Sequence, residues 1–248
     1  MSGLPPDLDA ALVAFGSRRP LLVASDYDGV LARLRDDPSA AVPEAGVAEV
    51  LARLVDADRV TVALVSGRGV ADLRTTSGLS GPFRWVGSHG AEFDGPLTGE
   101  LAARRDALVT QLAPVVARVA GARLEVKPAS VAVHVRPVPD RVAAAALLDE
   151  VRTLADSSLT MKPGKDVLEL AVTDADKGSA LLRLAGELGA AATVYLGDDV
   201  TDEDAFRALG ASDVTIKVGD GETDARHRVP DTAGALAVLE RLADLLDA

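Results

Sequence analysis

The chain has 248 residues, which is enough for one large domain or for a core domain with a smaller insert. Asp and Glu number 38 against 26 Lys and Arg, and the resulting formal net charge of −12 disfavours nucleic acids and anionic membrane surfaces as partners. Because there is no cysteine, disulfides, thiol nucleophiles and zinc–thiolate sites are excluded.

The start of the chain carries no recognisable targeting signal. Residues 1–6 lack the basic and apolar regions of a secretory signal, and no apolar run approaches the roughly 18 residues of a membrane span. We therefore expect a cytoplasmic protein without a membrane partner. We also expect it to be a monomer.

Short apolar segments flanked by turn residues alternate with amphipathic helical patterns in the first and last parts of the chain. Strands are expected at Leu21–Ser25, Val60–Val65, Thr193–Leu196 and Val214–Val218. Helices are expected at Glu44–Val55, Gly178–Leu188 and Ala233–Leu246. This alternation predicts a mostly parallel α/β sheet whose strands are buried on both faces.

Between about Leu101 and Val172 the pattern changes to a helix, two strands, a second helix and two more strands. One helix is expected over 101–119 and the other over Arg141–Leu154. The order αββαββ predicts a small antiparallel sheet backed by two helices. We expect an inserted α/β cap domain at residues 98–172, within a core domain formed by residues 1–97 and 173–248.

The strands of this insert alternate apolar and polar residues, so one face of its sheet is expected to be polar. A turn at Pro128–Val131 would place Glu125 opposite His134, and Pro163–Lys165 would form the second turn, with Met161 facing the helices. The polar face is expected to carry Glu125, Lys127, His134, Arg136, Lys162 and Glu169. A solvated face with cross-strand ion pairs is one interpretation, and a binding surface for a polyhydroxylated, anionic ligand is the other.

Two acidic residues, Asp26 and Asp28, follow the first expected strand directly. Ligands of open α/β sheets bind beyond the carboxyl ends of the strands. Two carboxylates about 4 Å apart repel each other by roughly 4 kcal/mol at an effective dielectric near 20, and a hard cation between them removes this repulsion. A solvated turn with two capping acids has the same sequence signature, whereas an EF-hand is disfavoured because its third acidic position before Gly29 is missing.

A second acidic cluster, Asp198, Asp199 and Asp202, follows a later expected strand. Ser66 comes directly after the strand at 60–65, and Lys177 stands at the start of a helix. Taken singly, these residues also fit an acidic helix start, a cap and a solvated surface charge. Together with the first pair of acids they favour one shared site.

These four segments resemble the ordered motifs of the haloacid-dehalogenase phosphatase superfamily, except that Val30 stands where many members carry Thr. The resemblance implies a Rossmann-like core and phosphoryl transfer through a covalent intermediate. It implies that Asp26 attacks phosphorus, and that Asp28 protonates the leaving oxygen and then activates water. It also implies that Ser66 hydrogen-bonds a phosphoryl oxygen and that Lys177 neutralises the nucleophile and the phosphoryl group.

The same resemblance implies a magnesium ion held by Asp26, Asp198 and the backbone carbonyl of Asp28, while Asp199 and Asp202 act through water or through contacts to these ligands. The charges of four of these acids, a divalent ion and one lysine leave the site near −1, which would repel a phosphate dianion. Extra cations are therefore expected in the insert, acting as a cap that closes over the substrate.

Further segments resemble trehalose-6-phosphate phosphatases in particular, namely Gly87–Glu92, the strand pair from 125 to 136, and Gly164–Lys165 with Glu169. The resemblance covers about residues 21–204 and implies a small-molecule sugar phosphate as the substrate. The residues implied to contact it are Glu125, Lys127, Lys165, Glu169, His89, Glu92, His134 and Arg136. By itself His89 also fits a hydrogen-bonded structural histidine, and Arg68 also fits a structural ion pair.

We therefore expect a magnesium-dependent phosphatase that hydrolyses trehalose 6-phosphate. A capped phosphatase for sucrose phosphate or a glycosyl-phosphoglycerate is an alternative within this class. A metal-dependent glycosyltransferase would also use an Asp-x-Asp pair, but it leaves Lys177 and the second acidic cluster unexplained. A catalytically silent sugar-phosphate sensor would bind without releasing phosphate, and the intact Asp26 and Asp28 argue against it.

Overall fold

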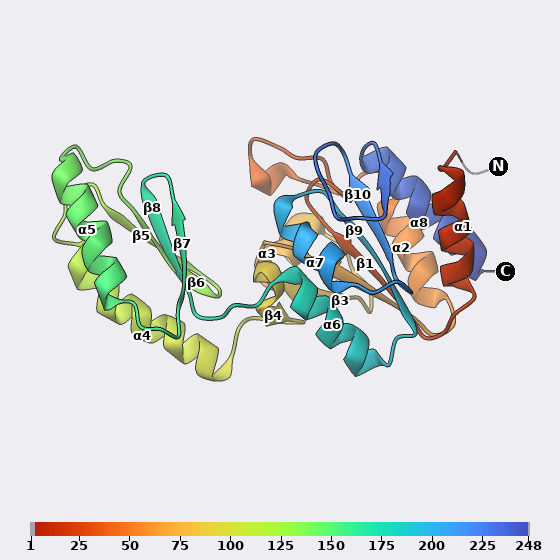
Figure 1. Cartoon of the computed structure of the whole chain (residues 1–248), viewed down its shortest axis with the longest axis horizontal. Coiled ribbons are helices and arrows are strands. Elements are labelled where there is room, and N and C mark those ends of the chain that lie inside the picture. The colour runs from red at the N-terminus through yellow and green to blue at the C-terminus, as the bar shows by residue number, and fades with distance from the viewer. Residues whose placement is uncertain (1–2, 248) are drawn as a thin grey trace. The chain divides into compact units, whose positions relative to one another are not determined.

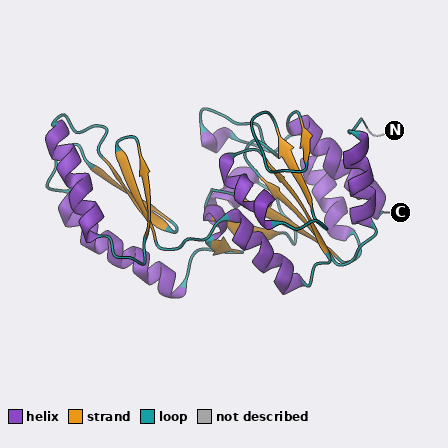
Figure 2. Ribbon diagram, viewed as in Figure 1, coloured by secondary structure: helices purple, strands orange, loops and turns teal. Residues whose placement is uncertain are grey.

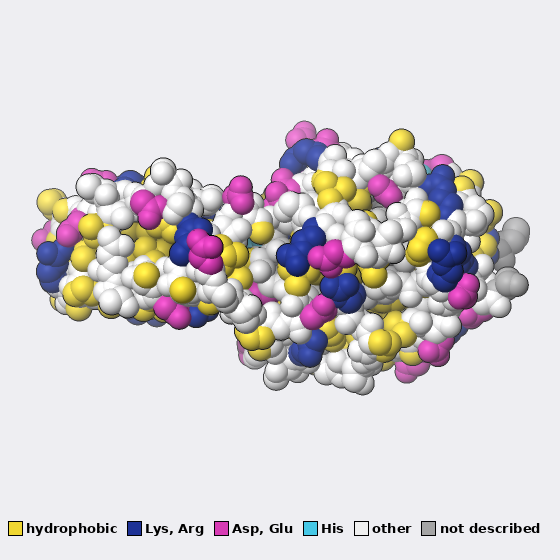
Figure 3. All heavy atoms as spheres, turned by 90° about the horizontal axis from the view of Figure 1, so that it is seen from below, with side chains coloured by type: hydrophobic (Ala, Val, Ile, Leu, Met, Phe, Trp, Pro, Cys, Tyr) yellow, Lys and Arg dark blue, Asp and Glu magenta, His cyan; other side chains and the backbone are white. Residues whose placement is uncertain are grey.

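The computed structural model describes residues 3–247. The described chain divides into two compact units, a core unit of residues 3–95 with 175–247 and an inserted unit, Pro96–Asp174 (Figure 1). Within the described residues, no helix combines the length and the apolar character that a membrane crossing requires. On the face drawn in Figure 3, acidic and basic side chains lie interspersed with one another.

The core unit is built on a seven-stranded sheet in the order β11-β10-β9-β1-β2-β3-β4. Its strands are β1 (Leu21–Asp26), β2 (Val60–Val65), β3 (Arg84–Gly87), β4 (Glu92–Phe93), β9 (Ala192–Gly197), β10 (Val214–Val218) and β11 (His227–Val229). Its helices are α1 (Pro6–Gly16), α2 (Val47–Asp56), α3 (Val70–Ser77), α6 (Lys177–Leu188), α7 (Glu203–Ala208) and α8 (Thr232–Leu246). All pairings are parallel except that of β3 with β4, which confirms the predicted, mostly parallel α/β sheet.

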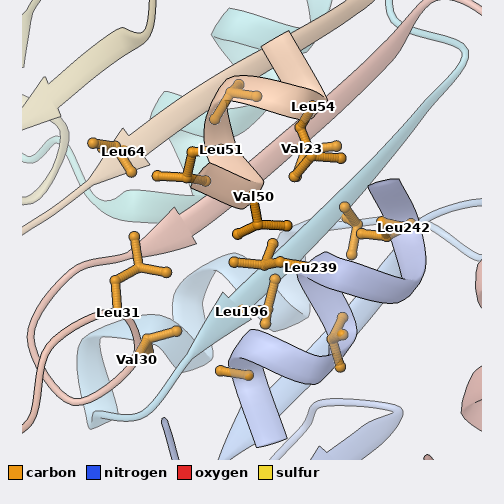
Figure 4. Packing of buried hydrophobic residues seen from close by; sticks show 14 of the residues in the cluster. Val23, Val30, Leu31, Val50, Leu51, Leu54, Leu64, Leu196, Leu239 and Leu242 are labelled. Carbon is orange, nitrogen blue, oxygen red and sulfur yellow. The ribbon is translucent and has the colours of Figure 1, made fainter. Parts of the chain in front are cut away.

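Helices cover both faces of this sheet, because successive side chains of each buried strand point to opposite sides (Figure 2). On one face, residues such as Val23 of β1 pack with Val50 of α2 and Leu239 of α8 in one large apolar cluster (Figure 4). On the other face, Leu22 packs with α6 and α7, for example with Leu184. The buried core strands are therefore mainly apolar, with a few polar side chains such as that of Lys217 in β10.

Replacing Leu239 by Ala is expected to lower the free energy of unfolding by about 2–5 kcal/mol, because the side chain is fully buried and the cavity cannot close completely. Chemical denaturation followed by circular dichroism measures this loss. Leu182→Ala in α6 is the matched control, since Leu182 is 50% exposed and its truncation should change the stability by no more than about 0.5 kcal/mol. Equal losses in both variants would contradict the packing described here.

The helix expected at Glu44–Val55 begins three residues later, at Val47. Gly46 precedes it with a left-handed φ of 94°, so the preceding residues form a turn instead of a first helical turn. The elements α1, α3, α7, β3, β4 and β11 had no counterpart among the expected elements.

The inserted unit has a four-stranded antiparallel sheet in the order β5-β6-β8-β7, backed by two helices. Its elements are α4 (Gly99–Val116), β5 (Arg123–Lys127), β6 (Ser130–His134), α5 (Arg141–Leu154), β7 (Thr160–Gly164) and β8 (Val167–Ala171). This order confirms the predicted αββαββ arrangement. Apolar side chains of the two central strands and the two helices form its core, among them Leu112, Val133 and Leu170.

Two details of this sheet differ from the expectation. Pro163 and Gly164 belong to β7, so the turn lies at residues 165–166, where Asp166 adopts a left-handed φ of 59°. Met161 is 50% exposed, because the helices cover the central strands and leave the edge strand β7 partly open.

The register of the first hairpin also differs by two residues. Glu125 lies opposite Ala132, and His134 lies opposite Arg123. A shift by two residues leaves every side chain on its expected face. The Oε2 atom of Glu125 consequently still reaches Nε2 of His134, along the diagonal, at 2.6 Å.

Candidate active site

The carboxyl ends of neighbouring strands bring the polar residues of the core unit together. The parallel register pairs Asp26 of β1 with Val65 of β2 and Ser25 with Leu196 of β9, so the residues that follow these strands emerge at one sheet edge. A pocket of about 600 Å³ opens there within the core unit. Of the residues selected from the sequence, its lining includes Asp26, Asp28, Ser66, His89, Lys177, Asp198 and Asp199.

Lys177 is the buried cation of this site. The Asp176 side chain caps the start of α6, and this cap directs Lys177 into the core unit, where only 2% of its side chain is exposed. Its Nζ lies 2.6 Å from Oδ2 of Asp26 and 2.7 Å from Oδ1 of Asp202. Burial alone would lower the pKa of Lys177, but the two carboxylates outweigh it and raise this pKa, so the ammonium stays charged.

Asp202 is fully buried, and its two oxygens accept four hydrogen bonds. Oδ1 accepts from Lys177 Nζ and, at 2.5 Å, from the Tyr195 hydroxyl. Oδ2 accepts from the backbone N–H groups of Asp198 and Asp199, both at 2.9 Å. A carboxylate has about four lone-pair directions, and here each has a donor. Asp202 therefore holds the turn that carries Asp198 and has no free oxygen lone pair for a metal ion.

The site has a donor set that suits a hard cation. Single carboxylate oxygens of Asp26 and Asp198 lie within 4.8 Å of each other, and an oxygen of Asp202, already engaged in hydrogen bonds, lies within the same distance of both. Burial, followed by the charge of Asp202, raises the pKa of Asp198 to about 6, and burial also raises the pKa of Asp26 against the opposing effect of Lys177. A cation bound by Asp26 and Asp198 would relieve this accumulation of negative charge. The Asp198 carboxylate lies directly against the backbone of Gly29. A Cβ at this position would lie 1.9 Å from Oδ2 of Asp198, so the arrangement requires glycine here.

Asp28 forms a bidentate ion pair with Arg68, for which the sequence alone had left the role open. Arg68 donates from Nε and Nη2 to its two carboxylate oxygens at 2.7 and 2.8 Å. The same guanidinium contacts Asp72 at 3.0 Å and the carbonyl of Pro38 at 2.6 Å. Two parallel hydrogen bonds fix the orientation of a carboxylate more tightly than one. Arg68 therefore positions Asp28 and adds a positive charge that the estimate of −1 omitted.

Ser66 and the segment Gly87–Glu92 line or support the same pocket. The Ser66 hydroxyl accepts a hydrogen bond from the backbone N–H of Arg68 at 3.1 Å. The ring of His89 packs so closely on Gly67 that a Cβ there would lie 2.6 Å from Cε1. Glu92 is buried outside the pocket lining, where its Oε2 accepts from the N–H of Val70 and from Ser88. These bonds tie Glu92 to the start of α3, and a contact between Glu92 and the substrate stays a prediction from the sequence.

The polar face of the inserted unit is organised around Glu169. Its two oxygens accept from Lys127 Nζ and from the Ser130 hydroxyl, each at 2.6 Å. Burial opposes ionisation, but these hydrogen bonds outweigh it and lower the pKa of Glu169. Lys165 and Arg136 are exposed and have no ion-pair partner within residues 3–247.

Two further residues support the site and were not selected from the sequence. Lys217 of β10 is buried, donates to the backbone carbonyl of Asp198 and lies 3.9 Å from Glu203. Tyr195 of β9 donates to Asp202. Both are polar residues within otherwise apolar strands, and this interruption of the apolar pattern is the signal that could have pointed to them.

Comparisons with known proteins agree with this geometry. Residues 24–232 match the family model described as trehalose-phosphatase. The chain is 37% identical to the trehalose-phosphate phosphatase of Mycobacterium avium, over 98% of this chain and 68% of that protein. It is 35% identical to the corresponding protein of Mycobacterium marinum, over 99% of this chain and 67% of the relative.

A solved structure shares the fold. The trehalose-6-phosphate phosphatase of Aspergillus fumigatus superposes with a TM-score of 0.75 at 26% identity, covering 95% of this chain and 97% of that one. The architecture is thus the haloacid-dehalogenase-like α/β fold with an inserted cap, as the motifs predicted. From the matched model, the identity to curated relatives and this likeness, it follows that the chain belongs to the trehalose-phosphatase family.

Proposed function

We propose that this protein hydrolyses trehalose 6-phosphate to trehalose and inorganic phosphate, with Mg²⁺ as cofactor and an aspartyl phosphate as intermediate. The observation that carries the proposal is the buried Asp26 carboxylate, which lies at the pocket floor beside Lys177 and within 4.8 Å of an Asp198 oxygen. The names of the relatives supply the substrate. As members of this family act on phosphate monoesters, the chain is a phosphoric monoester hydrolase.

The proposed reaction gives a task to four of the side chains that line the pocket. The Asp26 carboxylate attacks phosphorus, and the bond between phosphorus and the sugar oxygen breaks. Asp28, which in the substrate complex carries a proton and gives up one of its hydrogen bonds to Arg68, donates that proton to the sugar oxygen. Asp28 then accepts a proton from water, which attacks the aspartyl phosphate and restores Asp26. Ser66 donates to a phosphoryl oxygen, and Lys177 offsets the negative charge around Asp26.

The metal ion would be held by Asp26, Asp198 and the backbone carbonyl of Asp28. When bound, Mg²⁺ neutralises charge on the phosphoryl oxygens and orients them for in-line attack. Asp202 keeps Asp198 in place through the backbone of the 198–199 turn, and Asp199 acts outside the ligand set. The residues present fit this ion, since Mg²⁺ prefers carboxylate and carbonyl oxygens.

The polar face of the inserted unit is proposed to bind the sugar phosphate. Carboxylates can accept from sugar hydroxyls, while the exposed cations can meet phosphate or hydroxyl oxygens. The residues proposed for these contacts are Glu125, Lys127, His134, Arg136, Lys165 and Glu169. His89, which lines the pocket of the core unit, is proposed as a further substrate contact. A monomeric state and a cytoplasmic location stay predictions from the sequence.

Phosphate release from a panel of sugar phosphates tests the substrate and the metal together. We expect trehalose 6-phosphate to be preferred over sucrose 6-phosphate, a glycosyl-phosphoglycerate and glucose 6-phosphate. Chelation of divalent ions should lower turnover by about 1,000-fold or more, and added Mg²⁺ should restore it. Preference for another member of the panel would reassign the substrate. Binding of a sugar phosphate without release of inorganic phosphate would favour a sensor. Full activity in the presence of chelator would refute the role of the metal.

A further inference from the structure

The charges that line the pocket of the core unit are close to balance. Its lining contains the carboxylates Asp26, Asp28, Asp72, Asp198 and Asp199. It contains the cations Arg35, Arg68 and Lys177. The lining thus has a net charge of −2, which one divalent ion would bring to zero. A phosphate dianion that enters then gains attraction only from a cation that no carboxylate already neutralises.

Two of the three cations are engaged by acids. Lys177 lies between Asp26 and Asp202, and Arg68 binds Asp28 and Asp72. Arg35 is exposed and has no ion pair or hydrogen bond with any part of the chain that the structure describes. It is therefore the lining cation whose full charge remains available to a ligand.

The loop of residues 33–42 carries Arg35, and its Ala41 carbonyl accepts a hydrogen bond from the Tyr27 hydroxyl. Two further attachments hold its base and its tip. At its base, Ala32 pairs with Pro43 in an isolated antiparallel bridge. Near its tip, Arg68 donates to the carbonyl of Pro38 at 2.6 Å. Both attachments restrict the loop, so presenting Arg35 to a ligand costs less conformational entropy than it would from a free loop.

We propose that Arg35 binds phosphoryl oxygens of the substrate in this pocket. The proposal rests on the proposed function, in which Asp26 attacks the phosphorus atom. A guanidinium presents two N–H groups side by side, which matches the geometry of two phosphoryl oxygens and is available here without breaking an existing pair. Arg35 thereby supplies, within the core unit, part of the positive charge that the charge count from the sequence placed entirely in the insert.

Inorganic phosphate is a probe that needs no turnover. Calorimetric titration of the full chain in Mg²⁺ should show orthophosphate binding that Arg35→Gln weakens by about 10-fold and Arg35→Lys weakens less. In steady-state assays with trehalose 6-phosphate, Arg35→Gln should raise KM by a similar factor, while kcat changes by less than about two-fold. High salt screens the charge of Arg35, so it should reduce the difference in phosphate affinity between the wild type and Arg35→Gln.

Arg33→Gln is the matched control, because it removes the same charge from the same loop. Arg33 is paired with Glu44 at 2.7 Å and does not line the pocket, so phosphate affinity and KM should keep their wild-type values. Unchanged phosphate affinity in Arg35→Gln, an equal loss in Arg33→Gln, or no orthophosphate binding by the wild type would each overturn the proposal. If the chain binds orthophosphate but releases no phosphate from trehalose 6-phosphate, the proposed substrate would be refuted. The phosphate titration would still test the role of Arg35 independently.

Discussion

Asp26→Asn is expected to reduce phosphate release from trehalose 6-phosphate by at least about 10,000-fold. The amide has nearly the shape of the carboxylate but is a poor nucleophile, so the covalent step loses its attacking group. Initial rates at saturating Mg²⁺ measure the loss. Rapid acid quench during turnover should trap phosphate on the wild-type chain and none on the variant.

The variant should nevertheless fold. Asp26 is buried among like charges, and Lys177 retains Asp202 as a partner, so neutralising Asp26 removes repulsion as well as an ion pair. We expect a melting temperature equal to or above that of the wild type. Asp36→Asn is the control, since Asp36 is exposed and outside the pocket lining, and its activity should match the wild type. Persistent turnover by a folded Asp26→Asn protein would remove Asp26 from the nucleophile role.

The convergence of Asp26, Ser66 and Asp198 could be predicted from the sequence because it depends on two regular features. Strands that are apolar on both faces are recognisable as a buried parallel sheet, and their carboxyl ends lie at one edge. The polar face of the insert was predictable for a similar reason, since side chains alternate along a strand whatever the pairing.

The partner of each polar group was not predictable in the same way. The pair of Arg68 with Asp28 joins residues 40 positions apart, and Lys217 reaches the Asp198 carbonyl from another strand. Such pairs are selected by tertiary packing, which spacing along the chain does not encode. The hairpin register depends on turn geometry, so Glu125 was placed on the correct face but opposite the wrong residue.

Lys177→Met is expected to lower both stability and activity. The substitution leaves Asp26 and Asp202 buried without their shared cation, and removing one partner of a buried ion pair costs roughly 3–5 kcal/mol. Activity should fall by about 100- to 1,000-fold even under conditions in which the variant is folded, because the phosphoryl group loses a fixed positive charge. Urea titrations and initial rates on the same preparation measure the two losses.

The stability loss can be assigned to the ion pair with a double substitution. If the cost comes from unpaired carboxylates, Lys177→Met combined with Asp26→Asn should be more stable than Lys177→Met alone. Arg183→Met is the control on the same helix, since Arg183 is an exposed partner of Glu187 and its loss should cost no more than about 1 kcal/mol.

Added Mg²⁺ gives a further measurement of the same balance of charge. A divalent ion bound by Asp26 and Asp198 replaces part of the positive charge that Lys177 supplied. When both proteins bind the ion, Mg²⁺ should therefore raise the melting temperature of Lys177→Met more than that of the wild type. Two results together would show that Lys177 acts through packing of its apolar stem. The losses of unfolding free energy would add in the double variant, and Mg²⁺ would stabilise Lys177→Met no more than the wild type. The buried carboxylates would then tolerate each other without a cation, and the electrostatic basis of the site would be wrong.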